Sequence, residues 1–218
     1  MIRRALDIWA AALMLVLTAP IQVLVAALVA HDLGHPVLFR QTRTGLRERP
    51  FTLVKFRTMR ATTSTDDMTR DAERLTPLGA RLRSWSLDEL PTLWNVLRGD
   101  LSLVGPRPLL PQYLSLYTPE QRRRHTIRPG VTGLAQVRGR NALPWADRLA
   151  LDVWYVDHTS LTLDLQILAD TVVLVLSRRG VTEPGRATMT PLTAAVARMA
   201  VGTGPTRSRS TPTHTESS

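Results

Sequence analysis

Two adjacent carboxylates, Asp88 and Glu89, are the first side chains in this sequence whose types and spacing suit chemistry. They precede a run that predicts a helix to about Arg98, ended by Gly99, a typical residue after a last helical turn. One interpretation is structural, because Ser86 and Glu89 match the S-x-x-E capping box and Asp88 is itself a suitable cap. The other is chemical, because N–H groups at a helix start favour anions and keep Asp88 ionised, hence nucleophilic, beside a phosphate. Both interpretations remain open at this point.

A rigid arginine follows the acidic pair. Arg107 lies between two prolines in the sequence VGPRP, and prolines restrict the backbone that carries it. A guanidinium held in this way matches phosphate oxygens with paired hydrogen bonds. Lys55, the only lysine of the chain, lies in the alternating sequence FTLVKFRTM, which predicts a half-buried strand with a basic side chain facing solvent or a site. The combination indicates phosphate chemistry.

The composition narrows the class of partner. The chain has 218 residues, enough for one domain with its own core, and a net charge of +10. It has no cysteine, which excludes disulfides, thiolate catalysis and cysteine-ligated metals. The charge favours anionic partners, which include nucleic acid, anionic lipid and phosphorylated substrates. The histidines His35, His125 and His158 show no metal-ligand spacing.

An uncharged apolar segment runs from Ile8 to Ala30. As a helix it is about 35 Å long, close to the thickness of a hydrocarbon core. Pro20 lies near its middle and predicts a kink, and arginines flank both ends. Because positive charge marks the cytoplasmic side, a re-entrant helix satisfies both ends, whereas a straight span satisfies one. A cleaved signal peptide is the third interpretation, although the apolar run is long for one.

The remaining patterns predict an α/β, helix-rich single domain with a small β-hairpin. The hairpin strands are expected at 37–41 and 51–58, separated by a turn-rich segment. Residues 128–133 are expected to form a turn, and helices are expected at 71–84, after the acidic pair with a start at 86–88 and an end near 98, at 109–124 with a break at Pro119, at 144–158 and at 161–176. The expected organisation is a membrane helix and connector at 1–36, a catalytic domain at 37–188, and a C-terminal extension at 189–218, disordered from about residue 202.

With these residues assembled, the sequence resembles the bacterial sugar transferases, which are monotopic polyprenyl-phosphate sugar-1-phosphate transferases. The resemblance runs from about Ile2 to Thr188 and rests on several long motifs in order. These are the apolar segment with Pro20, KFRTM, RSWSLDELPTLWNVLRGDLSLVGPRPLLP, RPGVTGLAQVRGRN and LDVWYVDHTSLTLDLQIL.

The resemblance implies transfer of a sugar 1-phosphate from a UDP-sugar to a polyprenyl (undecaprenyl) phosphate, with release of UMP and a requirement for Mg2+. It implies that Asp88 is the nucleophile of a covalent phosphosugar intermediate and that Glu89 is its partner carboxylate. We expect Asp88 to be a ligand of the Mg2+ ion as well. The basic positions that it links to the phosphates are Lys55, Arg83, Arg107 and Arg140. It also implies a re-entrant membrane helix, a catalytic domain on the cytoplasmic face of the bacterial plasma membrane, and a role in starting membrane glycan or exopolysaccharide assembly.

The competing hypothesis is a membrane-tethered basic module that binds nucleic acid or anionic lipid without catalysis. Its binding would fall steeply with salt and would not depend on Asp88. The basic residues are, however, interleaved with acids and grouped on proline and glycine turns, and no aromatic stacking platform accompanies them. We therefore favour the enzyme and expect no nucleic-acid partner. The sugar, the pathway product and the oligomeric state are left open by the sequence.

Overall fold

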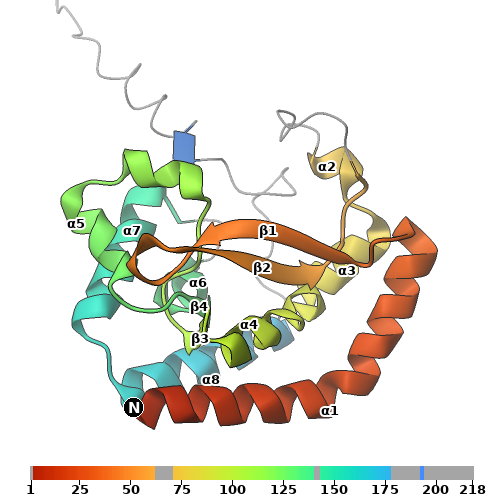
Figure 1. Cartoon of the computed structure of the whole chain (residues 1–218), viewed down its shortest axis with the longest axis horizontal. Helices are drawn as coiled ribbons and strands as arrows, with labels where there is room; N and C mark the ends of the chain where they lie inside the picture. The colour runs from red at the N-terminus through yellow and green to blue at the C-terminus, as the bar shows by residue number, and fades with distance from the viewer. Residues whose placement is uncertain (1, 62–70, 140–142, 178–191, 194–218) are drawn as a thin grey trace, which may run out of the picture.

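The computed structural model describes residues 2–61, 71–139, 143–177 and 192–193. Its longest element is helix α1 (Ile2–Leu33), which contains Pro20 and bends as it passes along the edge of the domain (Figure 1). Proline has no N–H to continue the helical hydrogen bonds, which accounts for a bend at this position. Nearby, the Thr18 hydroxyl donates to the carbonyl of Met14 (2.6 Å), and the Gln22 amide donates to Thr18 Oγ1 (3.0 Å). The predicted apolar helix with a proline kink is therefore present.

Helix α1 is long and apolar enough to cross a membrane. Both of its ends are attached to the same domain. Near the start, Arg3 forms an ion pair with Asp164 (2.7 Å) and donates to the Tyr155 hydroxyl (2.7 Å). At the other end, Arg57 donates hydrogen bonds to the carbonyls of residues 33, 34 and 35, which would otherwise lack partners at a helix terminus.

The predicted hairpin is confirmed. Strands β1 (Leu38–Thr44) and β2 (Pro50–Phe56) pair antiparallel, with Arg43 opposite Phe51 and Phe39 opposite Lys55. Strand β1 runs to Thr44 rather than to Gln41, because the chain turns only at Gly45, whose N–H donates to the carbonyl of Arg49 (2.8 Å). The short 3-10 helix η1 (Leu46–Glu48) completes the turn. Arg43 is thereby part of the strand.

The helix expected to follow the acidic pair and to end near Arg98 forms in two pieces. The 3-10 turn η3 (Leu87–Glu89) carries the acidic pair, and α4 (Thr92–Arg98) follows, ending at Gly99 in the left-handed conformation as predicted. The prediction of a capping box is wrong, because the Ser86 side chain makes no capping hydrogen bond. Its own φ is +56°, and its N–H donates to the carbonyl of Arg83, so Ser86 ends the preceding helix instead of starting the next.

The prediction of a turn at residues 128–133 is wrong in part, because this segment contains a short strand. Strand β4 (Gly130–Thr132) pairs parallel with β3 (Ser102–Val104), next to the VGPRP loop. The backbones approach closely, since a Cβ added to Gly130 would lie 2.1 Å from the amide nitrogen of Gly105. Glycine at these positions lets one three-residue strand lie against the other.

Helices surround these two small sheets. Helices α2 (Asp71–Arg74) and α3 (Pro77–Ser84) follow the hairpin, and η4 (Pro111–Leu116), α5 (Pro119–Arg122), η5 (Arg123–His125) and α6 (Leu134–Gly139) lie farther along the chain. The helices predicted at 144–158 and 161–176 are confirmed as α7 (Trp145–Asp157) and α8 (Leu161–Ser177). One cluster of buried side chains joins α1, α4, β3, α6, α7 and α8, including Ala11, Val96, Leu101, Leu134, Tyr155 and Ile167.

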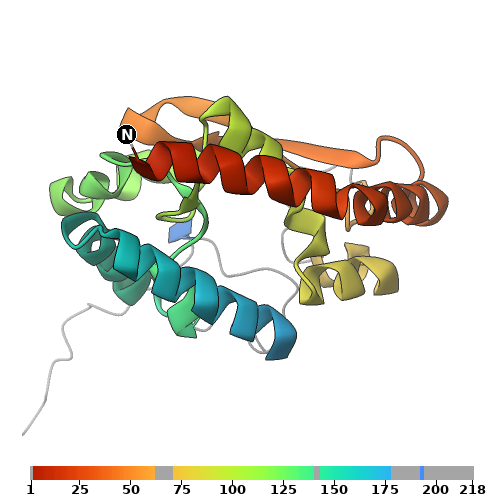
Figure 2. The same cartoon turned by 90° about the horizontal axis from the view of Figure 1, so that it is seen from below.

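Helices α1 and α8 both lie on the face of the domain seen from below (Figure 2). Many of their exposed side chains are large and apolar, and those more than half exposed include Trp9, Val16, Val23, Leu165, Val173 and Leu176. Apolar exposure on this scale is typical of a site of contact with a membrane or a protein.

Candidate active site

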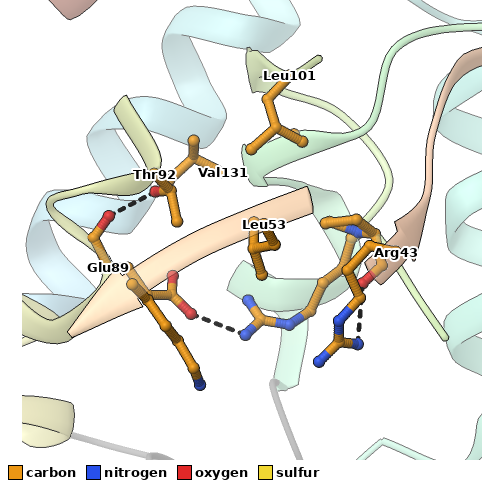
Figure 3. A pocket seen from close by; sticks show the side chains of 10 residues that line it. Arg43, Leu53, Glu89, Thr92, Leu101 and Val131 are labelled. Carbon is orange, nitrogen blue, oxygen red and sulfur yellow. Dashed lines mark hydrogen bonds and ion pairs between the residues drawn. The ribbon is translucent and has the colours of Figure 1, made fainter. Parts of the chain in front are cut away.

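A pocket opens between the hairpin and the VGPRP loop. Its walls come from β1, β2, the start of α4 and the β3–β4 region, and its lining residues are Arg43, Leu53, Lys55, Glu89, Thr92, Leu101, Arg107, Pro108, Gly130 and Val131. Figure 3 shows the side chains of Glu89 and Arg43 entering this pocket from opposite sides. The structure therefore brings together three of the residues singled out in the sequence, Lys55, Glu89 and Arg107.

Asp88 precedes the pocket residue Glu89 in the turn η3, is 5% exposed, and is not itself one of the residues that line the pocket. Burial raises the pKa of the Asp88 carboxyl, and the negative charge of Glu89 raises it further. Lys55, Arg83 and Arg107 oppose the increase in the pKa of Asp88. The expectation that the surroundings of Asp88 favour its ionised form is therefore wrong, because burial and the charge of Glu89 outweigh the nearby cations. The cations Lys55, Arg83 and Arg107 favour the charged form but only partly offset the cost of burial.

Glu89 orients the loop arginine. One Glu89 carboxylate oxygen accepts a hydrogen bond from Arg107 Nη2 at 2.8 Å, and the negative charge of Glu89 raises the pKa of the Arg107 guanidinium. Thr92 donates its hydroxyl to the Glu89 carbonyl, which joins the turn η3 to helix α4. Glu89 thus holds a positive group at the pocket instead of capping a helix.

Two further cations face Asp88 from separate elements. Lys55 lies in β2 with its Nζ 5.5 Å from the centre of the Phe39 ring on the neighbouring strand, and burial lowers its pKa while the charge of Asp88 raises it. Arg83, at the end of α3, donates from Nε to the Thr58 hydroxyl at 3.0 Å. Residues far apart in the sequence therefore converge on one carboxyl group.

A buried ion pair supports the loop that carries Arg107. Arg124 donates to the backbone carbonyl of Arg107 (2.7 Å) and pairs with Asp152 of α7 (2.6 Å). The side chains of Arg124 and Asp152 are 1% and 2% exposed. Burial raises the pKa of Asp152, and the Arg124 charge opposes this increase. Prolines alone therefore do not fix the position of Arg107, and this pair was not found from the sequence.

Arg43 is a pocket residue that the sequence analysis missed. The predicted strand ended at Gln41, which left Arg43 in the turn. Strand alternation contained the missing signal, because Phe39, Gln41 and Arg43 share one face of β1, and that face carries Leu53 and Lys55 across the pair. The pairing register of the two strands was needed to show that Arg43 lies on the same face as Lys55.

Arg140 lies outside the described residues, as does the extension beyond residue 177 apart from 192–193. Within the described ranges, no three His, Asp or Glu side chains are grouped to hold a metal ion. Mg2+ is commonly held by one or two carboxylates together with substrate phosphates, so Asp88 and Glu89 fit a site of that kind.

The sequence of this chain is similar to those of several sugar transferases. The chain is 50% identical over 188 residues to the uncharacterized sugar transferase EpsL of Bacillus subtilis, which covers 86% of this chain and 93% of that protein. It is 44% identical over 186 residues to the UDP-glucose:undecaprenyl-phosphate glucose-1-phosphate transferase of Caulobacter vibrioides. That match covers 80% of this chain and 70% of the relative. It is 37% identical over 200 residues to the exopolysaccharide production protein ExoY of Rhizobium meliloti. That match covers 83% of this chain and 88% of the relative. The family model for bacterial sugar transferases matches residues 1–178. The chain therefore belongs to the bacterial sugar transferase family and is an enzyme of that class.

Proposed function

We propose that this enzyme transfers a sugar 1-phosphate from a UDP-sugar to a polyprenyl phosphate and releases UMP. The observation that carries the proposal is the burial of the Asp88 carboxyl among the cations Lys55, Arg83 and Arg107. This arrangement combines a nucleophile with the positive charge that a diphosphate requires. The name of the Caulobacter relative, which specifies UDP-glucose and undecaprenyl phosphate, supports these substrate classes, and the exopolysaccharide relatives support a role at the start of glycan assembly.

In the first half-reaction, an oxygen of the Asp88 carboxylate attacks the phosphorus that carries the sugar. A new O–P bond forms, the bond from that phosphorus to the bridging oxygen breaks, and UMP leaves with the electron pair. Lys55 and Arg107 stabilise the negative charge that develops on the phosphate oxygens. Glu89 keeps Arg107 oriented through their ion pair.

In the second half-reaction, an oxygen of the polyprenyl phosphate attacks the same phosphorus. The bond between Asp88 and phosphorus breaks, and the carboxylate returns to its starting state. Because two anionic substrates need not occupy the pocket together, the same cations serve both steps. Ping-pong kinetics follow from this order. Bound Mg2+ would be held by Asp88 or Glu89 and would neutralise phosphate charge.

We propose that α1 is re-entrant and that the catalytic domain lies on the cytoplasmic face of the plasma membrane. The 32 residues of α1 would extend about 48 Å if straight, and the ends of a straight span lie on opposite sides of a core of about 30 Å. Arg3 and Arg57 instead hold the two ends against one domain. A bend at Pro20 allows both ends to remain on one side, with the apolar surfaces of α1 and α8 against lipid.

The test is incubation of the full chain, extracted from membranes in detergent, with undecaprenyl phosphate, Mg2+ and each member of a UDP-sugar panel. We expect UMP release with at least one UDP-sugar and formation of a polyprenyl diphosphate sugar. A folded protein that releases no UMP across the panel would contradict the proposal and favour the basic binding module.

The pH dependence gives a separate prediction. Asp88 attacks only when deprotonated, so kcat/KM for the UDP-sugar should decrease at low pH, with its midpoint above the ordinary aspartate value of about 4. Lys55→Met removes a charge that lowers the pKa of Asp88, so it should move the midpoint to higher pH. Glu89→Gln removes a charge that raises the pKa of Asp88, so it should move the midpoint to lower pH. The measurement is kcat/KM across pH for all three proteins. Shifts in the same direction in both variants would contradict the electrostatic assignment.

A further inference from the structure

Arg43 of strand β1 is one of the side chains that line the pocket. It lies near the end of β1, on the face of the hairpin that carries Leu53 and Lys55, and it lines the pocket with Arg107. Figure 3 shows its guanidinium projecting into the pocket across from Glu89.

The hydrogen bonds of Arg43 are made to neutral groups. Nη1 donates to the carbonyl of Pro108 (3.3 Å) and Nη2 donates to the side-chain oxygen of Gln41 (2.5 Å). Nε is buried without a hydrogen-bond partner, and none of the ion pairs within the described part of the chain includes Arg43. Buried polar groups normally have partners, so an unsatisfied N–H at a pocket indicates that a ligand supplies the acceptor.

The buried Arg124 shows what a structural arginine looks like in the same protein. It donates to the carboxylate of Asp152 and to the carbonyl of Arg107, and its charge is paired within the fold. Arg43 has no such carboxylate. Burial and the charge of Arg107 lower the pKa of Arg43 to about 10, and Tyr113 and Glu89 oppose this decrease, so the surroundings favour the cation less than water does.

The net charge of the residues that line the pocket also favours an anionic ligand. Three of its lining residues, Arg43, Lys55 and Arg107, are basic, and only Glu89 is acidic. Adding the carboxylate of the neighbouring residue Asp88 still leaves an excess of positive charge. A bound phosphate would offset this excess and accept hydrogen bonds from a guanidinium fork.

We propose that Arg43 is a further phosphate-binding residue of the active site, contacting a phosphate of the UDP-sugar or that of the polyprenyl acceptor. Its role rests on the proposed function, because it assumes these two substrates. Arg43 also supports the loop, because its hydrogen bond to the Pro108 carbonyl joins β1 to the residue that follows Arg107.

The test compares Arg43→Met with Arg40→Met in the full chain. Arg40 lies on the same strand, is exposed and points to the opposite face, so it is a matched control for loss of one arginine. KM is measured for each substrate in turn, with the UDP-sugar that the wild type turns over. We expect Arg43→Met to raise one KM by about 10- to 100-fold, the range for a lost hydrogen bond to a charged group, and Arg40→Met to change both by no more than about twofold.

The affected substrate identifies the phosphate. A higher KM for the UDP-sugar alone assigns Arg43 to the donor, and a higher KM for the polyprenyl phosphate alone assigns it to the acceptor. Unchanged KM values for both substrates would overturn the assignment even if kcat falls, because a purely structural role through Pro108 predicts that result. A wild type that releases no UMP would instead contradict the proposed function.

Arg43→Lys covers the case in which Arg43→Met does not fold. It keeps the charge but loses the planar fork, so we expect the same KM to rise by a smaller factor, about 3- to 10-fold. A folded Arg43→Lys enzyme with wild-type KM values for both substrates would also overturn the proposal.

Discussion

Replacing Asp88 with asparagine is expected to lower the rate of UMP release by about 10³-fold or more, while the protein remains folded. The size of the effect follows from removal of the nucleophile, because asparagine cannot form the phosphosugar bond and other pocket residues do not replace it. UMP release from the UDP-sugar measures it. Asp147→Asn is a suitable control, because Asp147 is an exposed acid in the first turn of α7.

The same variant should be more stable than the wild type at neutral pH. Because burial raises the pKa of Asp88, folding favours its protonated form, and the folded state loses stability as pH rises through that pKa. Asparagine is neutral at all pH values and avoids this loss. The difference in Tm between Asp88→Asn and wild type should therefore grow from about pH 4 upward. A variant that retains near-normal UMP release and is less stable would make Asp88 a structural residue and contradict its role as the nucleophile.

Breaking the buried pair between Arg124 and Asp152 is expected to have the largest effect on stability. Asp152→Asn leaves the Arg124 charge uncompensated in the core, which should lower the free energy of unfolding by about 3–5 kcal/mol. Activity should also fall, because Arg124 holds the Arg107 carbonyl. The measurements are urea unfolding in detergent and UMP release.

The exposed pair between Glu48 and Arg122 provides the control for this prediction. Glu48→Gln should change the free energy of unfolding by only about 0–1 kcal/mol, because solvent screens that pair. The double variant Arg124→Met with Asp152→Leu should recover much of the stability but not the activity, since it removes both buried charges and the bond to the Arg107 loop. Equal losses from Asp152→Asn and Glu48→Gln would show that the buried pair does not support the fold.

Features with local physical causes were determined by the sequence alone. The apolar run with Pro20 predicted α1 and its kink, strand alternation predicted the hairpin, and helical periodicity predicted α7 and α8. The pairing of Asp88 with Glu89 and the rigid arginine loop were also evident, because neighbouring residues define them. Membership of the transferase family was predicted from the order of these motifs and is confirmed by the comparisons.

Only the tertiary structure decided how distant segments meet. Three-residue strands have no recognisable period, so the parallel pairing of Ser102–Val104 with Gly130–Thr132 depends on the packing of the surrounding helices. The conformation of Ser86 was decided by the end of α3, which outweighed its capping motif. Burial set the direction of the pKa shift of Asp88, and the hairpin register placed Arg43 in the pocket. Each of these depends on contacts between residues far apart in the chain, and a sequence pattern contains only the preferences of neighbours.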